Sequence, residues 1–215
     1  MRTLAIISRK GGTGKTTLAV SLGAAAESHY KDPRGSVCIF DADPQESASV
    51  WFEARELGFP FVVRCGHRKA LPPDPDRAKT SLLVIDTPPQ KSGHAAAAVE
   101  RADFVLIPAR PGLLDLAAIS ASLTLARDKG RPAAVVLNAA PVRSPLIGLS
   151  NEALWEAGAV IAPTVHQRVA HTYAVAEGKV AAEREPGCKA AAEIERLWRW
   201  LDVQMDQHQA LGAAG

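Results

Sequence analysis

Short runs of aliphatic residues recur along the chain and are separated by Ala-rich or polar stretches. Most of these runs are continuously apolar rather than alternating, which is typical of parallel strands that are covered by helices on both faces. The runs predict strands at Leu4–Ile7, Val37–Phe40, Phe61–Val63, Leu82–Ile85, Phe104–Ile107, Ala133–Leu137 and Val160–Ile161.

The stretches between the runs have helical spacing, and a last helix is expected near the C-terminus. This alternation predicts an α/β fold with a doubly wound, mostly parallel sheet of about seven strands and helices on both faces. The segment 64–81 is rich in Pro and charge and is predicted to be an irregular connection. Without a repeat or a linker, we expect one domain over residues 1–215. The predicted helices are Thr16–Ser28, Glu46–Leu57, Gly93–Arg101, Leu113–Lys129, Asn151–Glu156 and Gly187–Met205.

The composition is that of an ordinary globular protein, with 47% hydrophobic and 22% charged residues and a net charge of +2. Affinity for a polyanion would therefore have to come from local clustering of charge. The three cysteines, Cys38, Cys65 and Cys188, lie far apart, which argues against a zinc or iron–sulfur site and fits a reducing cytosol. The first apolar run is too short for a signal peptide or a membrane span, so we expect a cytoplasmic protein.

A glycine-rich loop follows the first predicted strand and precedes the first predicted helix. Its residues 10–17 read KGGTGKTT. Glycines allow the backbone to wrap closely and point several N–H groups at one phosphate, and the helix N-terminus adds a partial positive charge. By the chemistry of such P-loops, Lys15 would contact the β- and γ-phosphates, Thr16 would bind Mg²⁺, and Thr17 would reach the α-phosphate. The predicted nucleotide-binding residues of the loop are Lys10, Gly11, Gly12, Thr13, Gly14, Lys15, Thr16 and Thr17.

Polar residues follow the ends of three other predicted strands, where ligands of open α/β sheets bind. Asp41 and Asp43 follow the second strand, Asp86 follows the fourth, and Asn138 follows the sixth. A lone Asp at a strand end is more often a helix cap or a turn residue. Three such residues beside a phosphate loop favour a functional site instead. Asp86, after four apolar residues, is placed like the Walker B carboxylate that holds Mg²⁺.

The bound base is expected to be adenine. Guanine readers of this broad class carry Asn-Lys-x-Asp, whereas residues 138–141 read NAAP and lack the aspartate. Asn138 is then a candidate contact for the base, and an Asn in a turn after a strand is an equally good interpretation.

The segment KGGTGKTT resembles the deviant Walker A motif of the ParA/MinD superfamily, and residues 41–45 (DADPQ) resemble the second acidic motif of that family. The resemblance implies a slow ATPase that uses ATP and Mg²⁺. It implies that Lys10 reaches across a sandwich homodimer to the partner's phosphates and acts with Lys15. It also implies that Asp43 orients the attacking water, and that Asp41 supports a metal shell formed with Thr16 and Asp86.

Similarity to small plasmid-partition ATPases extends through residues 107–116 and 167–194, and the loop begins only a few residues in. The chain therefore resembles the short ParA type, close to the ParF group. This implies that the ATP-bound dimer binds DNA non-specifically on the nucleoid. A centromere-binding, ParB-like adaptor would release it by stimulating hydrolysis, and plasmid or chromosomal DNA would thereby be segregated.

DNA binding of this kind depends on basic side chains that neutralise phosphates. Arg168 matches a position that family members use, and Lys179, Lys189, Arg196 and Arg199 are weaker candidates. Because residues 164–200 contain six Lys/Arg and five Glu, dimerisation would have to pool the basic residues of two chains. Taken singly, each is better explained as a solvated surface charge. Three basic and three acidic residues at 189–202 argue against a membrane-binding helix.

Other functions remain open at this point. Some relatives of the family position carboxysomes or chemoreceptor clusters with the same machinery. A ligase of the dethiobiotin-synthetase type shares the fold, although Lys10 and the DADPQ segment argue against it. A nucleotide-binding module without turnover is a third alternative.

Overall fold

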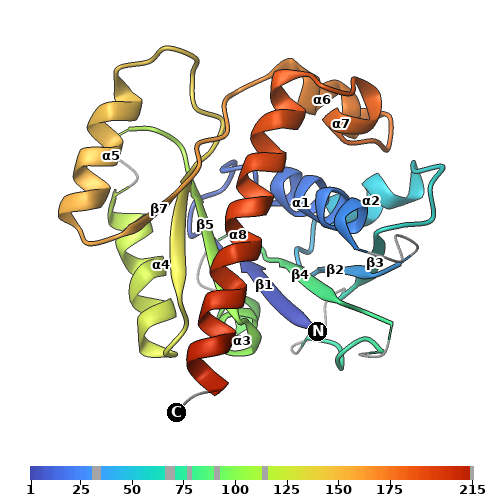
Figure 1. The fold of residues 1–215 in the computed structure, drawn as a ribbon, viewed down its shortest axis with the longest axis horizontal. Helices are drawn as coiled ribbons and strands as arrows, with labels where there is room; N and C mark the ends of the chain where they lie inside the picture. The colour runs from blue at the N-terminus through green and yellow to red at the C-terminus, as the bar shows by residue number, and fades with distance from the viewer. Residues whose placement is uncertain (31–34, 66–70, 77–78, 90–92, 113–115, 214–215) are drawn as a thin grey trace.

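A seven-stranded parallel sheet runs through the protein in the computed structural model (Figure 1). The structure describes residues 1–30, 35–65, 71–76, 79–89, 93–112 and 116–213. The strand order is β3-β2-β4-β1-β5-β6-β7, which confirms the predicted doubly wound sheet. All seven predicted strands are present, at β1 Arg2–Ile6, β2 Val37–Asp41, β3 Phe61–Arg64, β4 Leu82–Asp86, β5 Phe104–Ala109, β6 Ala133–Leu137 and β7 Val160–Ala162.

Helices cover both faces of the sheet and separate two apolar layers. One layer packs α1, α2 and α8 against the sheet, and the other packs α3, α4 and α5 against the opposite face. Figure 1 shows α8 crossing the first face with α1 beside it. The helices are α1 Lys15–His29, α2 Ser47–Glu53, α3 Gly93–Arg101, α4 Leu116–Asp128, α5 Leu146–Glu156, α6 Val169–Ala176, α7 Ala181–Arg184 and α8 Lys189–Ala213.

The helices differ from the predicted ones chiefly in the last third of the chain. Helices α6 and α7 were not predicted, because α6 buries only Ala174 and so has no apolar periodicity. Helix α5 begins five residues earlier than expected (146 rather than 151), since its first turns expose Leu146 and Leu149. Helix α8 continues past Met205 with exposed polar residues. Residues 113–115 of the predicted fourth helix lie outside the described residues.

The C-terminal helix docks on the sheet through its apolar side. Leu197, Trp198, Leu201 and Met205 are buried there against the layer formed with α1. Trp198 is therefore a core residue. Among the described residues, no helix is long and apolar enough to cross a membrane.

A buried carboxylate fixes the segment that enters β2. Glu27 of α1 accepts hydrogen bonds from the backbone N–H groups of Gly35 (2.6 Å), Ser36 (3.0 Å) and Val37 (2.8 Å). Buried N–H groups that lose their acceptor retain their desolvation cost. This one side chain therefore joins the end of α1 to the start of the strand that carries Asp41.

We expect Glu27→Ala to lower the free energy of unfolding by about 2–4 kcal/mol, because three buried donors would lose a charged acceptor. Urea unfolding followed by circular dichroism measures the change. Glu156→Ala, which removes an exposed carboxylate from α5, serves as the control and should change stability by less than about 0.5 kcal/mol. A Glu27 variant as stable as this control would contradict the prediction.

Candidate nucleotide-binding site

The loop between β1 and α1 has the conformation and the space that only glycine allows. Gly12 and Gly14 have φ values of 73° and 83°, in the left-handed region. A Cβ atom at Gly14 would lie 2.4 Å from Nδ2 of Asn138. The loop therefore lies directly against the end of β6, and the helix N-terminus after Gly14 remains open to an anion.

Lys15 is the first residue of α1 and is buried beside this loop. Burial lowers the pKa of Lys15, and the nearby negative charges of Asp86 and Asp43 oppose that shift. The ammonium group in this position thus lies in the field of two nearby carboxylates. It supplies positive charge where the open N–H groups of the helix already favour phosphate.

A cavity of about 430 Å³ opens in front of the loop. Its size falls in the range of small-molecule sites. Its wall combines the loop and the first turn of α1 with the start of α2 and with apolar side chains of α1, α2 and α6. The lining residues are Gly11, Gly12, Gly14, Lys15, Thr16, Thr17, Val20, Asp43, Gln45, Ser47, Trp51, Pro89 and Val175.

Two carboxylates lie side by side at the carboxyl ends of adjacent strands. Asp41 on β2 and Asp86 on β4 are direct partners in the parallel register, and both are fully buried. Oδ2 of Asp41 accepts hydrogen bonds from the backbone N–H and the hydroxyl of Ser49, each at 2.8 Å. Oδ1 of Asp41 and both oxygens of Asp86 make no hydrogen bond of good geometry among the described residues, although the Thr16 hydroxyl is near enough to Asp86 to favour its charged form.

Desolvation dominates the ionisation of this pair. Burial raises the pKa of Asp86 to about 7, and it also raises the pKa of Asp41. A bound cation would reverse this effect, because it favours the charged carboxylates. Three carboxylate oxygens that lack a good hydrogen bond, near the Thr16 hydroxyl, therefore fit Mg²⁺, a hard cation that prefers oxygen ligands.

The described residues contain no group of three His, Cys, Asp or Glu side chains arranged to hold a metal by themselves. This agrees with the usual chemistry of Mg²⁺, which keeps waters and is bound through one or two carboxylates together with substrate phosphates. The site thus has the donors for a metal–nucleotide complex rather than for a free metal ion.

The other predicted site residues occupy different places around the cavity. Asp43 is half-buried in its wall, and its Oδ1 accepts a hydrogen bond from the backbone N–H of Gln45 at 3.0 Å. Lys10 is exposed and lies outside the cavity lining. Asn138 is buried, and its amide donates to the carbonyl oxygen of Thr13 at 2.7 Å, so it supports the loop from within. Its proposed contact with adenine stays a prediction.

The candidate DNA-contacting residues are mostly engaged with acidic neighbours. Nη2 of Arg168 donates to Oε1 of Glu193 at 2.6 Å. Lys179 forms an ion pair with Glu177, and Arg199 forms one with Glu195. Lys189 and Arg196 are exposed. One subunit therefore presents isolated basic groups beside acidic ones rather than a continuous basic stripe.

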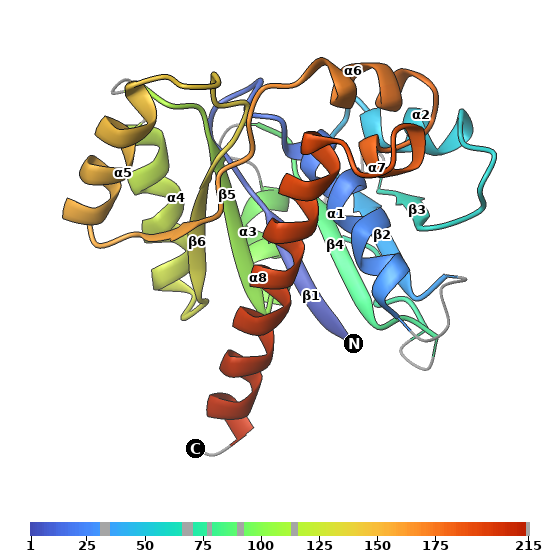
Figure 2. The same cartoon turned by 45° about the horizontal axis from the view of Figure 1, so that its top comes forward.

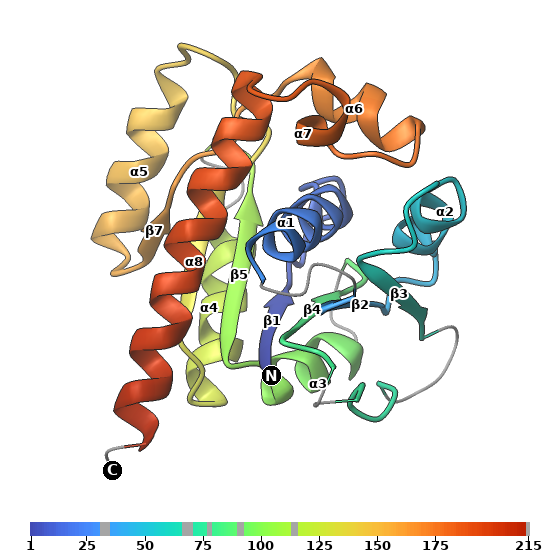
Figure 3. The ribbon, with the colours of Figure 1, turned by 45° about the vertical axis from the view of Figure 1, so that its right-hand side comes forward.

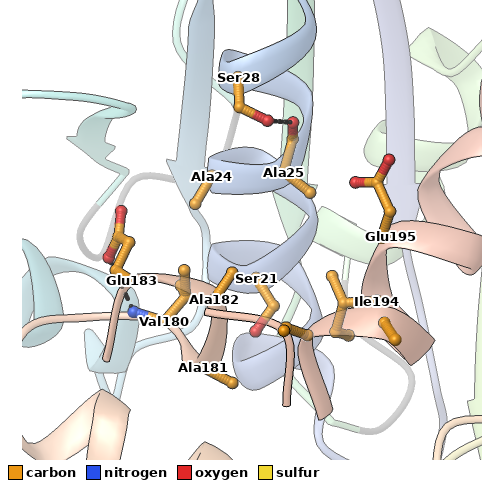
Figure 4. A pocket seen from close by; sticks show the side chains of 13 residues that line it. Ser21, Ala24, Ala25, Ser28, Val180, Ala181, Ala182, Glu183, Ile194 and Glu195 are labelled. Carbon is orange, nitrogen blue, oxygen red and sulfur yellow. Dashed lines mark hydrogen bonds between the residues drawn. The ribbon is translucent and has the colours of Figure 1, made fainter. Parts of the chain in front are cut away.

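Sequence reasoning missed the residues that complete the site from other elements. Trp51 and Val175 line the cavity, and Ser49 binds Asp41, yet none of them belongs to a recognisable motif. A second cavity of about 460 Å³ lies between α1, α7 and α8 and is lined mainly by small side chains (Figure 4). The predicted nucleotide and metal residues are not among its described lining residues.

Comparison with known proteins gives one matching family model. Residues 4–179 match the CobQ/CobB/MinD/ParA nucleotide-binding domain. The protein named Maintenance of carboxysome distribution protein A from Halothiobacillus neapolitanus is 30% identical over 212 residues, which cover 91% of this chain and 94% of that protein. The protein of the same name from Gloeobacter kilaueensis is 40% identical over 121 residues, which cover 55% of this chain and 53% of that protein. Protein ParA of Rhizobium radiobacter is 32% identical over 135 residues, which cover 60% of this chain and 58% of that protein.

Solved structures show the same fold at low identity. Apo McdA of Cyanothece superposes with a TM-score of 0.75 at 18% identity, covering 94% of this chain and 99% of that one. MinD of Pyrococcus horikoshii in complex with Mg-ADP has a TM-score of 0.74 at 17% identity, covering 94% and 96% of the two chains.

We expect the contribution of Asp86 to the stability of the nucleotide-free protein to fall as the pH rises from about 4 to 7. Asp86 has an ordinary pKa of 3.8, which burial raises to about 7, so the folded chain holds this proton more tightly than the unfolded chain does. The stabilisation is complete below the unfolded pKa and is lost as the pH passes the folded pKa.

Asp86→Asn should remove that loss and raise the free energy of unfolding at pH 8 by about 2 kcal/mol, with little change at pH 4.5. Urea unfolding at both pH values, without nucleotide or Mg²⁺, measures the difference. Asp128→Asn, at an exposed position, serves as the control. A variant that is less stable than the wild type at pH 8 would show that Asp86 is not destabilising when charged.

Proposed function

The chain belongs to the CobQ/CobB/MinD/ParA nucleotide-binding family, and we propose that it is an ATPase whose ATP-bound form is a sandwich dimer that positions a large cargo. The observation that supports this proposal is that two lysines of the same loop, Lys15 and Lys10, lie in different places. Lys15 is buried in the cavity, whereas Lys10 is exposed and lies outside its lining. An exposed lysine of this loop would meet the phosphates of a second copy that faces the cavity.

The residues of the site divide the work of phosphoryl transfer, which needs positioning and charge neutralisation more than covalent chemistry. The loop N–H groups, Lys15 and Thr17 bind the phosphates of ATP. Thr16, Asp41 and Asp86 would hold Mg²⁺, which supplies neutralising charge at the phosphate oxygens. Asp43 orients the attacking water, since its half-buried carboxylate lies in the cavity wall.

Lys10 of the second copy completes this arrangement. Its charge meets the phosphates only when two subunits face each other, so hydrolysis depends on dimerisation. ATP then serves as a switch, because the dimer persists until hydrolysis removes the phosphate that both subunits share. A partner protein that speeds hydrolysis would control where the dimer dissociates.

Non-specific DNA binding by the dimer supports cargo movement over the nucleoid. The isolated basic groups of one subunit, Lys189 and Arg196 among them, would be pooled when two subunits associate. Such binding rests on neutralising phosphates and is therefore strongly dependent on salt.

Two cargoes are compatible with this machine. A ParB-like adaptor bound to plasmid or chromosomal DNA is one, and similarity to a ParA protein supports it. A protein compartment linked through its own adaptor is the other, and similarity to two carboxysome distribution proteins supports it, one of them along 94% of its length. The second cargo is favoured by the more extensive similarity.

We expect Lys10→Ala to bind ATP with nearly wild-type affinity but not to dimerise with ATP. Its rate of ATP hydrolysis should fall at least tenfold. Sedimentation with ATP–Mg²⁺ and a phosphate-release assay measure the two effects. Lys129→Ala, which removes an exposed lysine at the end of α4, serves as the control. If Lys10→Ala dimerised and hydrolysed ATP like the wild type, its role across the dimer would be wrong.

We expect the ATP-bound protein to bind duplex DNA of any sequence. Its affinity should fall steeply between about 50 and 200 mM salt, because each neutralised phosphate releases counterions and so adds to the dependence on salt. Fluorescence anisotropy with random-sequence DNA measures this for ATP and ADP forms. The Lys189→Ala/Arg196→Ala double variant should bind more weakly and with a shallower salt slope. Lys79→Ala, at another exposed site, should not. Equal binding with ATP and ADP would exclude the switch.

A further inference from the structure

Two segments that lie far apart in the sequence meet at the wall of the nucleotide cavity. Trp51 of α2 and Val175 of α6 both line this cavity. Figure 2 shows α6 and α7 beside α2, and Figure 3 shows them above α1, toward α2 and away from α5. The width of the cavity therefore depends on how α2 and the α6–α7 segment are held relative to each other.

Packing in the core holds α6 only weakly. Ala174 is the only residue of α6 that is fully buried, and Val175 is packed partly against the core. Val169 and Tyr173 are exposed. Because apolar stabilisation is roughly proportional to the area removed from water, the single buried methyl group offers little of it. Polar contacts at the end of α6 must therefore help to fix its position.

Arg55, two residues after the end of α2, joins the two segments. Its side chain is only 2% exposed, and Nε donates to the carbonyl oxygen of Phe59 at 2.7 Å. Nη1 donates to the carbonyl oxygen of Gly178 at 3.0 Å, and both Nη atoms donate to the carboxylate of Glu183, one of them at 2.8 Å. The guanidinium also lies over the ring of Trp51, 4.7 Å from its centroid. A planar fork of donors defines direction as well as distance, so Arg55 fixes the α6–α7 segment against α2.

Both side chains that contact the Arg55 guanidinium make a second contact with the turn between α6 and α7. Glu183 accepts a hydrogen bond from the backbone N–H of Val180 at 2.9 Å, which holds the first turn of α7. Trp51 donates from Nε1 to the carbonyl oxygen of Lys179 at 3.0 Å. A residue of the cavity wall is thus bonded directly to this turn.

The same turn approaches α2 so closely that only glycine fits at position 178. Gly178 has a φ of 67°, in the left-handed region, and a Cβ atom there would lie 2.3 Å from the carbonyl oxygen of Ala54. That oxygen belongs to the backbone and cannot move aside as the end of a flexible side chain could. Any side chain at position 178 would therefore push the turn away from α2.

We propose that Arg55 is a positioning residue for the bound nucleotide. It is not among the described lining residues of the cavity, so it acts through Trp51 and Val175, whose separation it sets. The groups of a binding site have to be held to within about 0.5 Å of their productive geometry, which requires support from residues behind them. This inference rests on the proposed function, in which the cavity holds ATP.

The first test replaces Arg55 and measures the affinity for nucleotide. Arg55→Lys keeps the charge, but lysine cannot form the two-point pair with Glu183, so we expect the dissociation constant for Mg–ADP to rise about tenfold or more. Anisotropy of a fluorescent ADP analogue measures it without hydrolysis, at a temperature where circular dichroism shows each variant to be folded. Arg2→Lys serves as the control. The side chain of Arg2 is 14% exposed and pairs with Asp202 at the amino end of β1, so this variant should stay within about twofold of the wild type.

The kinetic constants separate positioning from a general loss of structure. Arg55→Lys should raise the KM for ATP by a similar factor and leave kcat at saturating ATP within about threefold of the wild type, because loss of uniform binding raises KM alone. Lys15 and Asp43 are unchanged in this variant. A fraction of misfolded protein would instead lower kcat and leave KM unchanged, and that result would refute the positioning role.

A second variant tests the same junction without changing Arg55. Gly178→Ala should also raise the dissociation constant for Mg–ADP about tenfold or more, because its Cβ atom would displace the turn from α2. Gly130→Ala is matched to it, since Gly130 has a φ of 63° and so a similar backbone strain, but a Cβ atom there meets no atom of the described residues within 4 Å. If Arg55→Lys and Gly178→Ala bound Mg–ADP as tightly as the wild type, the inference would be refuted while the proposed function survived. If the wild-type protein bound neither ADP nor ATP, both would be overturned.

Discussion

The burial of two carboxylates and one ammonium group at the carboxyl edge of the sheet is the constraint on which this structure depends. The parallel register of β2 and β4 places Asp41 beside Asp86, and α1 brings Lys15 to the same place. Removing like charges from water costs free energy that their own hydrogen bonds do not repay, since three of the four carboxylate oxygens make no hydrogen bond of good geometry among the described residues. The folded chain therefore carries a local destabilisation that a bound cation would relieve. We expect a site of this kind to bind its ligand strongly, and the ligand-free protein to be less stable for that reason.

The surrounding elements hold that edge in place from several sides. Asn138 at the end of β6 binds the loop carbonyl of Thr13, and Ser49 of α2 binds Asp41 with two hydrogen bonds. These contacts restrict the groups that would meet ATP, so little reorganisation is required on binding. The same α2 anchors the α6–α7 segment through Arg55. The nucleotide site and the α6–α7 segment are thus parts of one connected unit.

The distribution of surface charge explains why the assembly matters more than the single subunit. Arg168, Lys179 and Arg199 each lie within ion-pair distance of a Glu, so their charges are largely balanced locally. The two exposed pairs, Lys179–Glu177 and Arg199–Glu195, contribute little stability and are easily exchanged for other partners, whereas the Glu193 that holds Arg168 is buried. A polyanion can compete for them only where several are presented together, and this is what the proposed dimer would have to provide.

Sequence alone determined the seven strands, the parallel α/β order and the phosphate loop, because continuous apolar runs and a glycine-rich turn are local signals with local causes. It also placed Asp41 and Asp86 at strand ends, which is where the structure has them. Tertiary structure decided what local pattern cannot encode: that Asn138 faces the loop, that Ser49 holds Asp41, and that Trp51 and Val175 close the cavity. Helix α6 escaped prediction for the same physical reason. Val169 and Tyr173 are exposed and only Ala174 is fully buried, so no apolar periodicity marks the helix. The contacts of the following segment with α2, through Gly178 and Glu183 among others, help fix where it lies.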